Sequence, residues 1–125
     1  MIVGLGTDIV EIARVEESLQ RLGDAFARRI LTAVEFEAFL SSKRQSEFLA
    51  KRFAIKEAAA KALGTGIGRG VSWQHMTLEH DERGAPLLRF LDGALAQLQV
   101  LQGRNIHVSV SDEKHYAVAT VILER

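Results

Sequence analysis

The sequence has no cysteine among its 125 residues. The chain can therefore form no disulfide, present no thiolate nucleophile and offer no cysteine ligand to a metal ion. This absence is in keeping with a protein of a reducing compartment.

The sequence also lacks a net charge and a long apolar run. Sixteen Lys and Arg balance sixteen Asp and Glu, so the overall charge gives no sign of a nucleic-acid or membrane partner. No window approaches the roughly 18–20 apolar residues of a membrane span, and the first residues, MIVGLGTDIVEI, have no basic stretch typical of a secretion signal. We expect a soluble, cytoplasmic protein with a single domain over residues 1–125.

The segment from Phe48 to Gly66 is predicted to be a long buried helix. Its large apolar side chains cover more than half of the helix circumference, and alanines fill most of the rest. Lys56, Glu57 and Lys61 nevertheless lie within it, and ionised groups in such a setting are normally paired, metal-bound or directed into a cleft. Glu57 and Lys61 are four residues apart, so a simple ion pair along the helix stays open beside a functional role.

The remaining elements are predicted from apolar periodicity and turn residues. Gly4 and Gly6 in the first strand indicate that another part of the backbone approaches it closely. Thr32 and Glu35 form a T-x-x-E capping box. The predicted elements are a strand at Ile2 to Val10, helices at Glu11 to Leu22, Asp24 to Ile30, Ala33 to Leu40 and Gly93 to Leu101, and hairpins at Trp73 to Glu79 with Pro86 to Leu91 and at Ile106 to Ser111 with Tyr116 to Leu123.

These elements show little regular alternation of strand, helix and strand. We therefore predict an α+β fold in which antiparallel strands pack around the long central helix. The glycine-rich stretch GTGIGRG, residues 64–70, follows that helix. It matches neither a dinucleotide-binding nor a Walker signature, because it closes a helix and has Arg69 where the third glycine would stand. Gly64 is predicted to end the helix, and the loop's backbone amides remain free to hold a phosphate.

Asp8 and Glu57 are the two carboxylates that polarity alone does not explain. Two carboxylates, with room for water and substrate phosphates, are the usual protein ligands of Mg²⁺. Lys61, one turn after Glu57, and the glycine loop would then stabilise a metal-bound pyrophosphate. This interpretation requires a tertiary contact between Asp8 and Glu57. On its own, Asp8 can equally be a strand-end or capping residue.

Three stretches closely resemble one enzyme family. GLGTDIVEI near the start, FLAKRFAIKEAAAKALGTGIG in the centre and HVSVSDEKHYAVATVI near the end are similar to the small bacterial 4'-phosphopantetheinyl transferases of the holo-acyl-carrier-protein synthase type. The resemblance runs the length of the chain. It implies the 4'-phosphopantetheinyl transferase fold and transfer of the phosphopantetheine arm of coenzyme A to a serine of apo-acyl carrier protein, which releases adenosine 3',5'-bisphosphate and supports fatty acid biosynthesis.

The resemblance also implies roles for individual residues. Asp8 and Glu57 match the Mg²⁺ ligands of the family, and Lys61 matches the residue that contacts the pyrophosphate. We expect these three residues to be catalytic, with Glu57 helping to remove the serine proton either directly or through a metal-bound water. No nucleophile on the enzyme is required. Lys61 and the loop residues Gly64, Thr65 and Gly66 are expected to bind coenzyme A.

Further basic residues are expected at the ligand. The H-V-S-V match places His107 against coenzyme A across a subunit boundary, because the family forms homotrimers with sites between protomers. Arg52, Lys43, Arg44 and Arg69 are expected among the partners of the 3'-phosphate and the other anionic groups, although each can also be solvated surface.

Arg14 and Arg21, on the first helix, resemble the basic face that meets the acidic carrier protein. An ordinary exposed charged stripe remains open for these two residues. The main alternative to the whole interpretation is a non-catalytic coenzyme A or nucleotide-binding module, which would use the same basic helix and glycine loop. Such a module would not need Asp8 and Glu57 to hold a metal.

Overall fold

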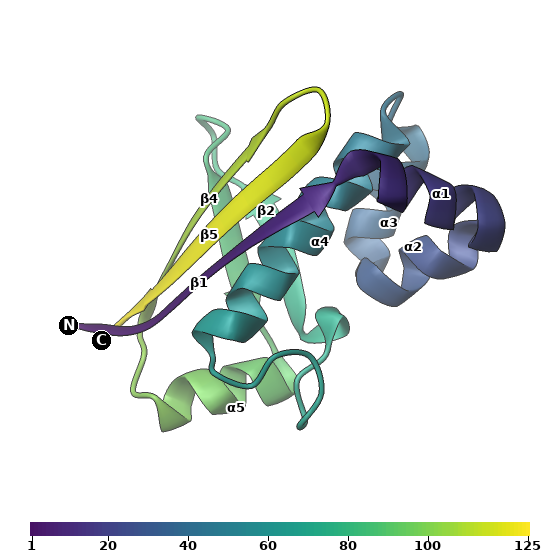
Figure 1. The fold of residues 1–125 in the computed structure, drawn as a ribbon. Helices are drawn as coiled ribbons and strands as arrows, with labels where there is room; N and C mark the ends of the chain where they lie inside the picture. Colours follow the sequence, from purple (N-terminus) through teal and green to yellow (C-terminus); the bar gives the residue numbers. More distant parts are fainter.

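The alternating apolar residues at the two ends of the sequence form one antiparallel sheet. The computed structural model describes residues 1–125, and its three-stranded sheet has the order β1-β5-β4, from β1 (Ile2–Glu11), β5 (Tyr116–Glu124) and β4 (Asn105–Asp112). Figure 1 shows the chain termini side by side at one end of this sheet, where the N–H of Arg125 donates to the carbonyl of Met1 at 2.8 Å. The predicted C-terminal hairpin is confirmed.

The second predicted hairpin is also present and forms its own sheet. Strands β2 (Met76–His80) and β3 (Pro86–Phe90) pair antiparallel. The prediction that the first strand starts at Trp73 is wrong, because Ser72 caps a 3-10 turn over Trp73–His75 and its Oγ accepts the N–H of Gln74. This turn precedes β2.

Five helices complete the chain: α1 (Ile12–Leu22), α2 (Asp24–Ile30), α3 (Ala33–Ser41), α4 (Gln45–Ala62) and α5 (Asp92–Val100). The capping box of Thr32 and Glu35 is confirmed at the start of α3. Helix α4 begins three residues before the predicted Phe48 and its last helical residue is Ala62. Leu63 caps the helix, and the N–H of Gly64 then donates to the carbonyl of Lys61. None of the helices is long and apolar enough to cross a membrane.

Helix α4 lies directly against β1 because the contact is made by residues with little or no side chain (Figure 1). A Cβ atom added to Gly4 would lie 2.2 Å from the carbonyl oxygen of Ala62, and one added to Gly6 would lie 1.9 Å from that of Ala58. The predicted close approach to this strand is thus confirmed, and the approaching backbone is that of α4. The contact sets how far Asp8, two residues after Gly6, lies from the helix.

Two charged residues of α4, Lys56 and Arg52, form ion pairs with Glu35 in the interior. The Nζ of Lys56 is fully buried and donates to Glu35 Oε1 at 2.6 Å, and Arg52 Nη1 donates to Glu35 Oε2 at 3.1 Å. Burial on its own would raise the pKa of the Glu35 carboxyl, but the charge and hydrogen bond of Lys56 and the backbone N–H of Thr32 hold that pKa below its ordinary value. The guanidinium of Arg52 is thus paired with Glu35 in the interior, where the residue is buried. Its expected contact with coenzyme A stays a prediction.

The face of the large sheet that points away from α4 is open. Leu5 and Ile9 of β1 and Val118 of β5 remain exposed there, Leu5 and Ile9 by about two thirds. Ile9 pairs with Val118 across the strands. These side chains form an apolar surface for which the single chain supplies no cover.

Candidate active site

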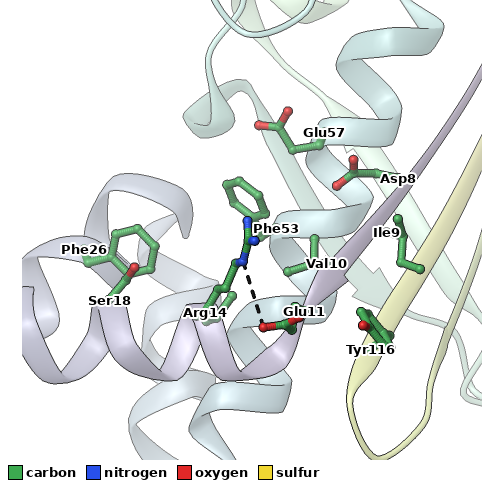
Figure 2. Close-up of a pocket in the computed structure, with 11 residues that line it drawn as sticks. Asp8, Ile9, Val10, Glu11, Arg14, Ser18, Phe26, Phe53, Glu57 and Tyr116 are labelled. Carbon is green, nitrogen blue, oxygen red and sulfur yellow. Dashed lines mark ion pairs between the residues drawn. The ribbon is translucent and has the colours of Figure 1, made fainter.

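A cleft of about 480 Å³ lies where β1 passes into α1 beside the middle of α4. Strand β1 contributes Asp8, helix α4 contributes Glu57 and Phe53, and helix α1 contributes Arg14 (Figure 2). The remaining lining residues are Ile9, Val10, Glu11, Val15, Ser18, Phe26 and Tyr116. The cleft therefore joins two predicted site carboxylates to a residue of the predicted carrier-binding face.

Asp8 and Glu57 come from different elements and enter the same part of this cleft (Figure 2). Asp8 faces α4 because it has the same strand parity as Gly4 and Gly6, whose faces lie against that helix. Its side chain is 17% exposed. The structure thus brings together the two carboxylates that the sequence analysis singled out.

Lys61 lies one turn after Glu57 but turns toward β1. Its Nζ donates to Asp8 Oδ1 and to the carbonyl of Thr7, both at 3.0 Å. The simple ion pair between Glu57 and Lys61 is absent. Lys61 is half exposed, so its ammonium group is positioned by β1 and still open to solvent on its other side.

The carboxylate of Glu57 has one hydrogen-bond partner, which sequence reasoning missed. The indole Nε1 of Trp73 donates to Glu57 Oε1 at 3.0 Å. The only sequence signal was a single tryptophan shortly after the glycine loop, and neither spacing nor periodicity relates it to Glu57. The Oε2 atom of Glu57 has no hydrogen bond and is available to a ligand.

The glycine loop continues from the C-terminal end of α4. Gly64 and Gly66 adopt φ values of 81° and 64°, and a Cβ atom at either position would meet nothing within 4 Å. Their backbones are therefore left-handed and open on the side where a side chain would stand. Thr65 lies between them and donates its Oγ1 to the carbonyl of Gly66. The loop does not line the cleft of Asp8 and Glu57.

The other predicted site residues are distributed over the surface. Arg14 is exposed at the cleft, with Nε 3.9 Å from Glu11 Oε1 (Figure 2), and Arg21 is exposed in the last turn of α1. His107 lies on β4, away from this cleft, with Nε2 3.0 Å from Glu124 Oε1. This hydrogen bond lowers the pKa of the exposed Glu124 carboxyl. Lys43, Arg44 and Arg69 are exposed and form no ion pair.

The carboxylate pair suits a cation that takes only part of its ligands from the protein and the rest from water and substrate. The chain has no group of three or more His, Asp or Glu residues that could hold a metal ion. Asp8 and Glu57 supply two hard oxygen donors in a cleft wide enough for water and phosphate. This donor set fits Mg²⁺, which keeps several waters and takes one or two carboxylates together with substrate phosphates.

Comparison with known proteins relates this chain to one family. A model of the 4'-phosphopantetheinyl transferase superfamily matches residues 4–121. A Shewanella frigidimarina protein named holo-[acyl-carrier-protein] synthase is 63% identical over 123 residues, covering 98% of each chain. A Vibrio cholerae protein of the same name is 64% identical over 126 residues, covering 100% of this chain and 99% of that protein.

Solved structures agree with the sequence relatives. The holo-[acyl-carrier-protein] synthase of Neisseria meningitidis superposes with a TM-score of 0.94 at 39% identity, with all of both chains covered. The Bacillus anthracis enzyme, solved with CoA (3',5'-ADP), gives a TM-score of 0.84 at 42% identity, covering 99% of this chain and 97% of that one. By its sequence, its fold and its relatives, the chain belongs to the 4'-phosphopantetheinyl transferase superfamily.

Proposed function

We propose that the protein is a holo-[acyl-carrier-protein] synthase, which transfers the 4'-phosphopantetheine arm of coenzyme A to a serine of apo-acyl carrier protein. The observation that carries the proposal is the cleft of Asp8 and Glu57 in a chain that is 63–64% identical to proteins of that name. The products are holo-acyl carrier protein and adenosine 3',5'-bisphosphate. By supplying the holo carrier, the reaction supports fatty acid biosynthesis.

The reaction exchanges one phosphorus–oxygen bond for another. The serine Oγ bonds to the phosphorus that bears the pantetheine arm, and the bond from that phosphorus to the bridging oxygen breaks. The electron pair leaves with adenosine 3',5'-bisphosphate. Glu57 helps to remove the serine proton, and Lys61 stabilises the charge on the leaving phosphate. The chain needs to supply orientation and charge, but no covalent nucleophile.

Asp8 and Glu57 are the residues that would hold Mg²⁺. When bound, the cation neutralises pyrophosphate charge and favours departure of the nucleotide. The existing contact between Lys61 and Asp8 Oδ1 keeps the lysine at the same carboxylate. Lys61 is therefore held at one of the two carboxylates, where its charge would help to neutralise the pyrophosphate.

Coenzyme A would extend from this carboxylate pair along the end of α4. Lys61 and the open backbone of Gly64, Thr65 and Gly66 are the contacts that we assign to it on this chain. The three residues form one continuous stretch with the C-terminus of α4. Exposed Lys43, Arg44 and Arg69 remain further phosphate partners in the proposal.

The proposed active species is a homotrimer with sites at its subunit boundaries. Leu5, Ile9 and Val118 form an uncovered apolar surface on the sheet, which a second copy of the chain would bury. Leu5 pairs with Ile122, and Ile122 pairs with His107, so these residues form one row across the sheet. This row supports a placement of His107 near a ligand held mainly by the neighbouring chain.

The carrier protein would approach from α1. Arg14 and Arg21 are exposed on that helix, and Arg14 also lines the cleft. An acidic partner would thus be attracted to the same side on which its serine must reach Asp8 and Glu57. A cytoplasmic place of action completes the proposal, on the basis of the cysteine-free composition.

Intact-mass measurement of the carrier tests the proposed activity. Apo-acyl carrier protein incubated with the protein, coenzyme A and Mg²⁺ should gain the mass of one phosphopantetheine group, and a carrier whose acceptor serine is replaced by alanine should not. Binding of coenzyme A without any change in carrier mass would refute the transferase and favour a non-catalytic binding module.

A further inference from the structure

Trp73 holds the Glu57 carboxylate at the cleft through the one hydrogen bond that this carboxylate makes. We propose that Trp73 is a positioning residue that selects the Glu57 rotamer competent to bind Mg²⁺ and occupies Oε1, so that Oε2 faces the ligand. The inference rests on the proposed function, since it deepens the role of the same site. Nothing in the glycine loop or the central helix motif requires a donor at this position.

The backbone of Trp73 is fixed from both sides. Its carbonyl accepts a hydrogen bond from Lys56 Nζ at 3.1 Å, and Lys56 is itself locked by Glu35 in the interior. Gln74 Nε2, from the adjacent residue, donates to the carbonyl of Leu31 at 2.7 Å. The turn that carries the indole is therefore tied to α4 and to the segment after α2.

The indole ring is also held against the helix that carries Glu57. Its centroid lies 6.2 Å from that of Phe53 at an interplanar angle of 34°. Phe53 precedes Glu57 by one helical turn and lines the cleft. The N–H donor is thus part of a packed group, and it orders a Glu side chain that would otherwise lose rotamer entropy when it binds a cation.

Such a donor acts on a carboxylate ligand in a predictable way. A hydrogen bond to one oxygen fixes the direction of the other, and loss of such a partner typically costs about 10–100-fold in metal affinity or activity. The donor here is neutral and comes from a residue outside the central helix. Because Trp73 contacts Glu57 and does not belong to the carrier-binding face of α1, loss of its N–H should weaken Mg²⁺ binding and lower kcat, and change the KM for the carrier much less.

Fluorescence provides a direct readout because Trp73 is the only tryptophan of the chain. Titration of the wild-type protein with MgCl₂ in the presence of coenzyme A should change the indole emission, since the cation alters the field at the hydrogen-bonded carboxylate. Glu57→Gln should raise the midpoint at least about tenfold. An emission unchanged at Mg²⁺ concentrations that saturate calorimetric binding would overturn the inference.

The Trp73→Phe variant removes the N–H and keeps an aromatic ring against Phe53. Calorimetry with MgCl₂ and coenzyme A should show about a tenfold weaker Mg²⁺ Kd. Gln74→Ala is the matched control, because it loosens the same turn and retains the indole donor. It should leave the Kd within about twofold, because Lys56 Nζ still holds the carbonyl of Trp73 and Phe53 still packs against the indole ring. An unchanged Kd in Trp73→Phe, or an equal loss in Gln74→Ala, would refute a specific role for the N–H.

These measurements separate the inference from the proposed function, because none of them needs transfer to occur. A protein that modifies the carrier but has the same Mg²⁺ Kd in wild type and Trp73→Phe would retain the proposed function and lose the inference. A protein that leaves the carrier unmodified, yet shows a roughly tenfold weaker Mg²⁺ Kd in Trp73→Phe, would retain the inference and lose the proposed function.

Discussion

Replacing Gly6 by alanine should damage the site without touching either of its carboxylates. A Cβ atom at this position would lie 1.9 Å from the carbonyl oxygen of Ala58 and 2.7 Å from the backbone nitrogen of Ala62. Both are backbone atoms of α4 and cannot rotate away. Ordinary contact begins at 3.4 Å, so the strand and helix must separate by roughly 1.5 Å, the difference between 3.4 and 1.9 Å.

That displacement has two measurable costs. Overpacking of this kind destabilises a protein by about 1–3 kcal/mol or slightly more, and the rigid backbone on both sides leads us to expect the upper end. Asp8 follows Gly6 by two residues and moves with β1, away from Glu57. A misplacement of about 1 Å at a catalytic group can reduce the rate by about 10²-fold, so transfer should fall by that order.

Urea unfolding and the initial rate of carrier modification, both measured well below the melting temperature, test this prediction. Gly84→Ala is the matched control. Gly84 has a φ of 83° and nothing within 4 Å of an added Cβ. The free energy of unfolding of this variant should fall by about 1–2 kcal/mol because of left-handed backbone strain, and its rate of carrier modification should stay at the wild-type value. A Gly6→Ala protein with wild-type stability and rate would refute the close helix–strand contact as the support of the site.

The remaining predictions concern the surface, the assembly and the buried charges. Charge reversal at Arg14 and Arg21 should raise the KM for the carrier in a salt-dependent manner and leave coenzyme A binding unchanged, whereas a loss of coenzyme A affinity would contradict a carrier-docking role. Inactive Glu57→Ala and inactive His107→Ala proteins should regain activity after subunit exchange, and no recovery despite proven exchange would place both residues in one protomer's site. Because the folded-state pKa of Glu35 lies below its ordinary value of 4.5, its contribution to stability is complete above that pH and is lost as pH falls. Urea unfolding should show this acid loss, and an equal acid loss in Glu35→Gln would exclude Glu35 as its source.

The sequence predicted the parts of the site whose residue types conflict with their surroundings. Asp8 in an apolar strand and Glu57 in an apolar helix each required an explanation, and both line one cleft. Gly4 and Gly6 are likewise unusual in a strand, and they predicted the close backbone approach that α4 makes. The α+β fold followed from the two clear hairpins and the periodicity of α4.

The sequence did not predict some tertiary contacts, because a contact with a near neighbour in the sequence already explained the residues involved. The carboxyl of Glu35 was accounted for by the capping box with Thr32, and its second task, pairing with Lys56 from 21 positions away, left no local signal. Arg52 consequently seemed free for a ligand. Helical spacing paired Lys61 with Glu57, but it could not reveal that β1 passes close enough to supply Asp8 instead.

The rate of holo-carrier formation by Asp8→Ala and Glu57→Ala, measured beside the wild type at the same subunit and Mg²⁺ concentrations, tests the central claim most directly. If the cleft between β1 and α4 is where transfer occurs, each variant should be slower by at least about 10²-fold, with coenzyme A still bound. Near-normal rates in both variants would contradict the account and place the chemistry elsewhere on the molecule.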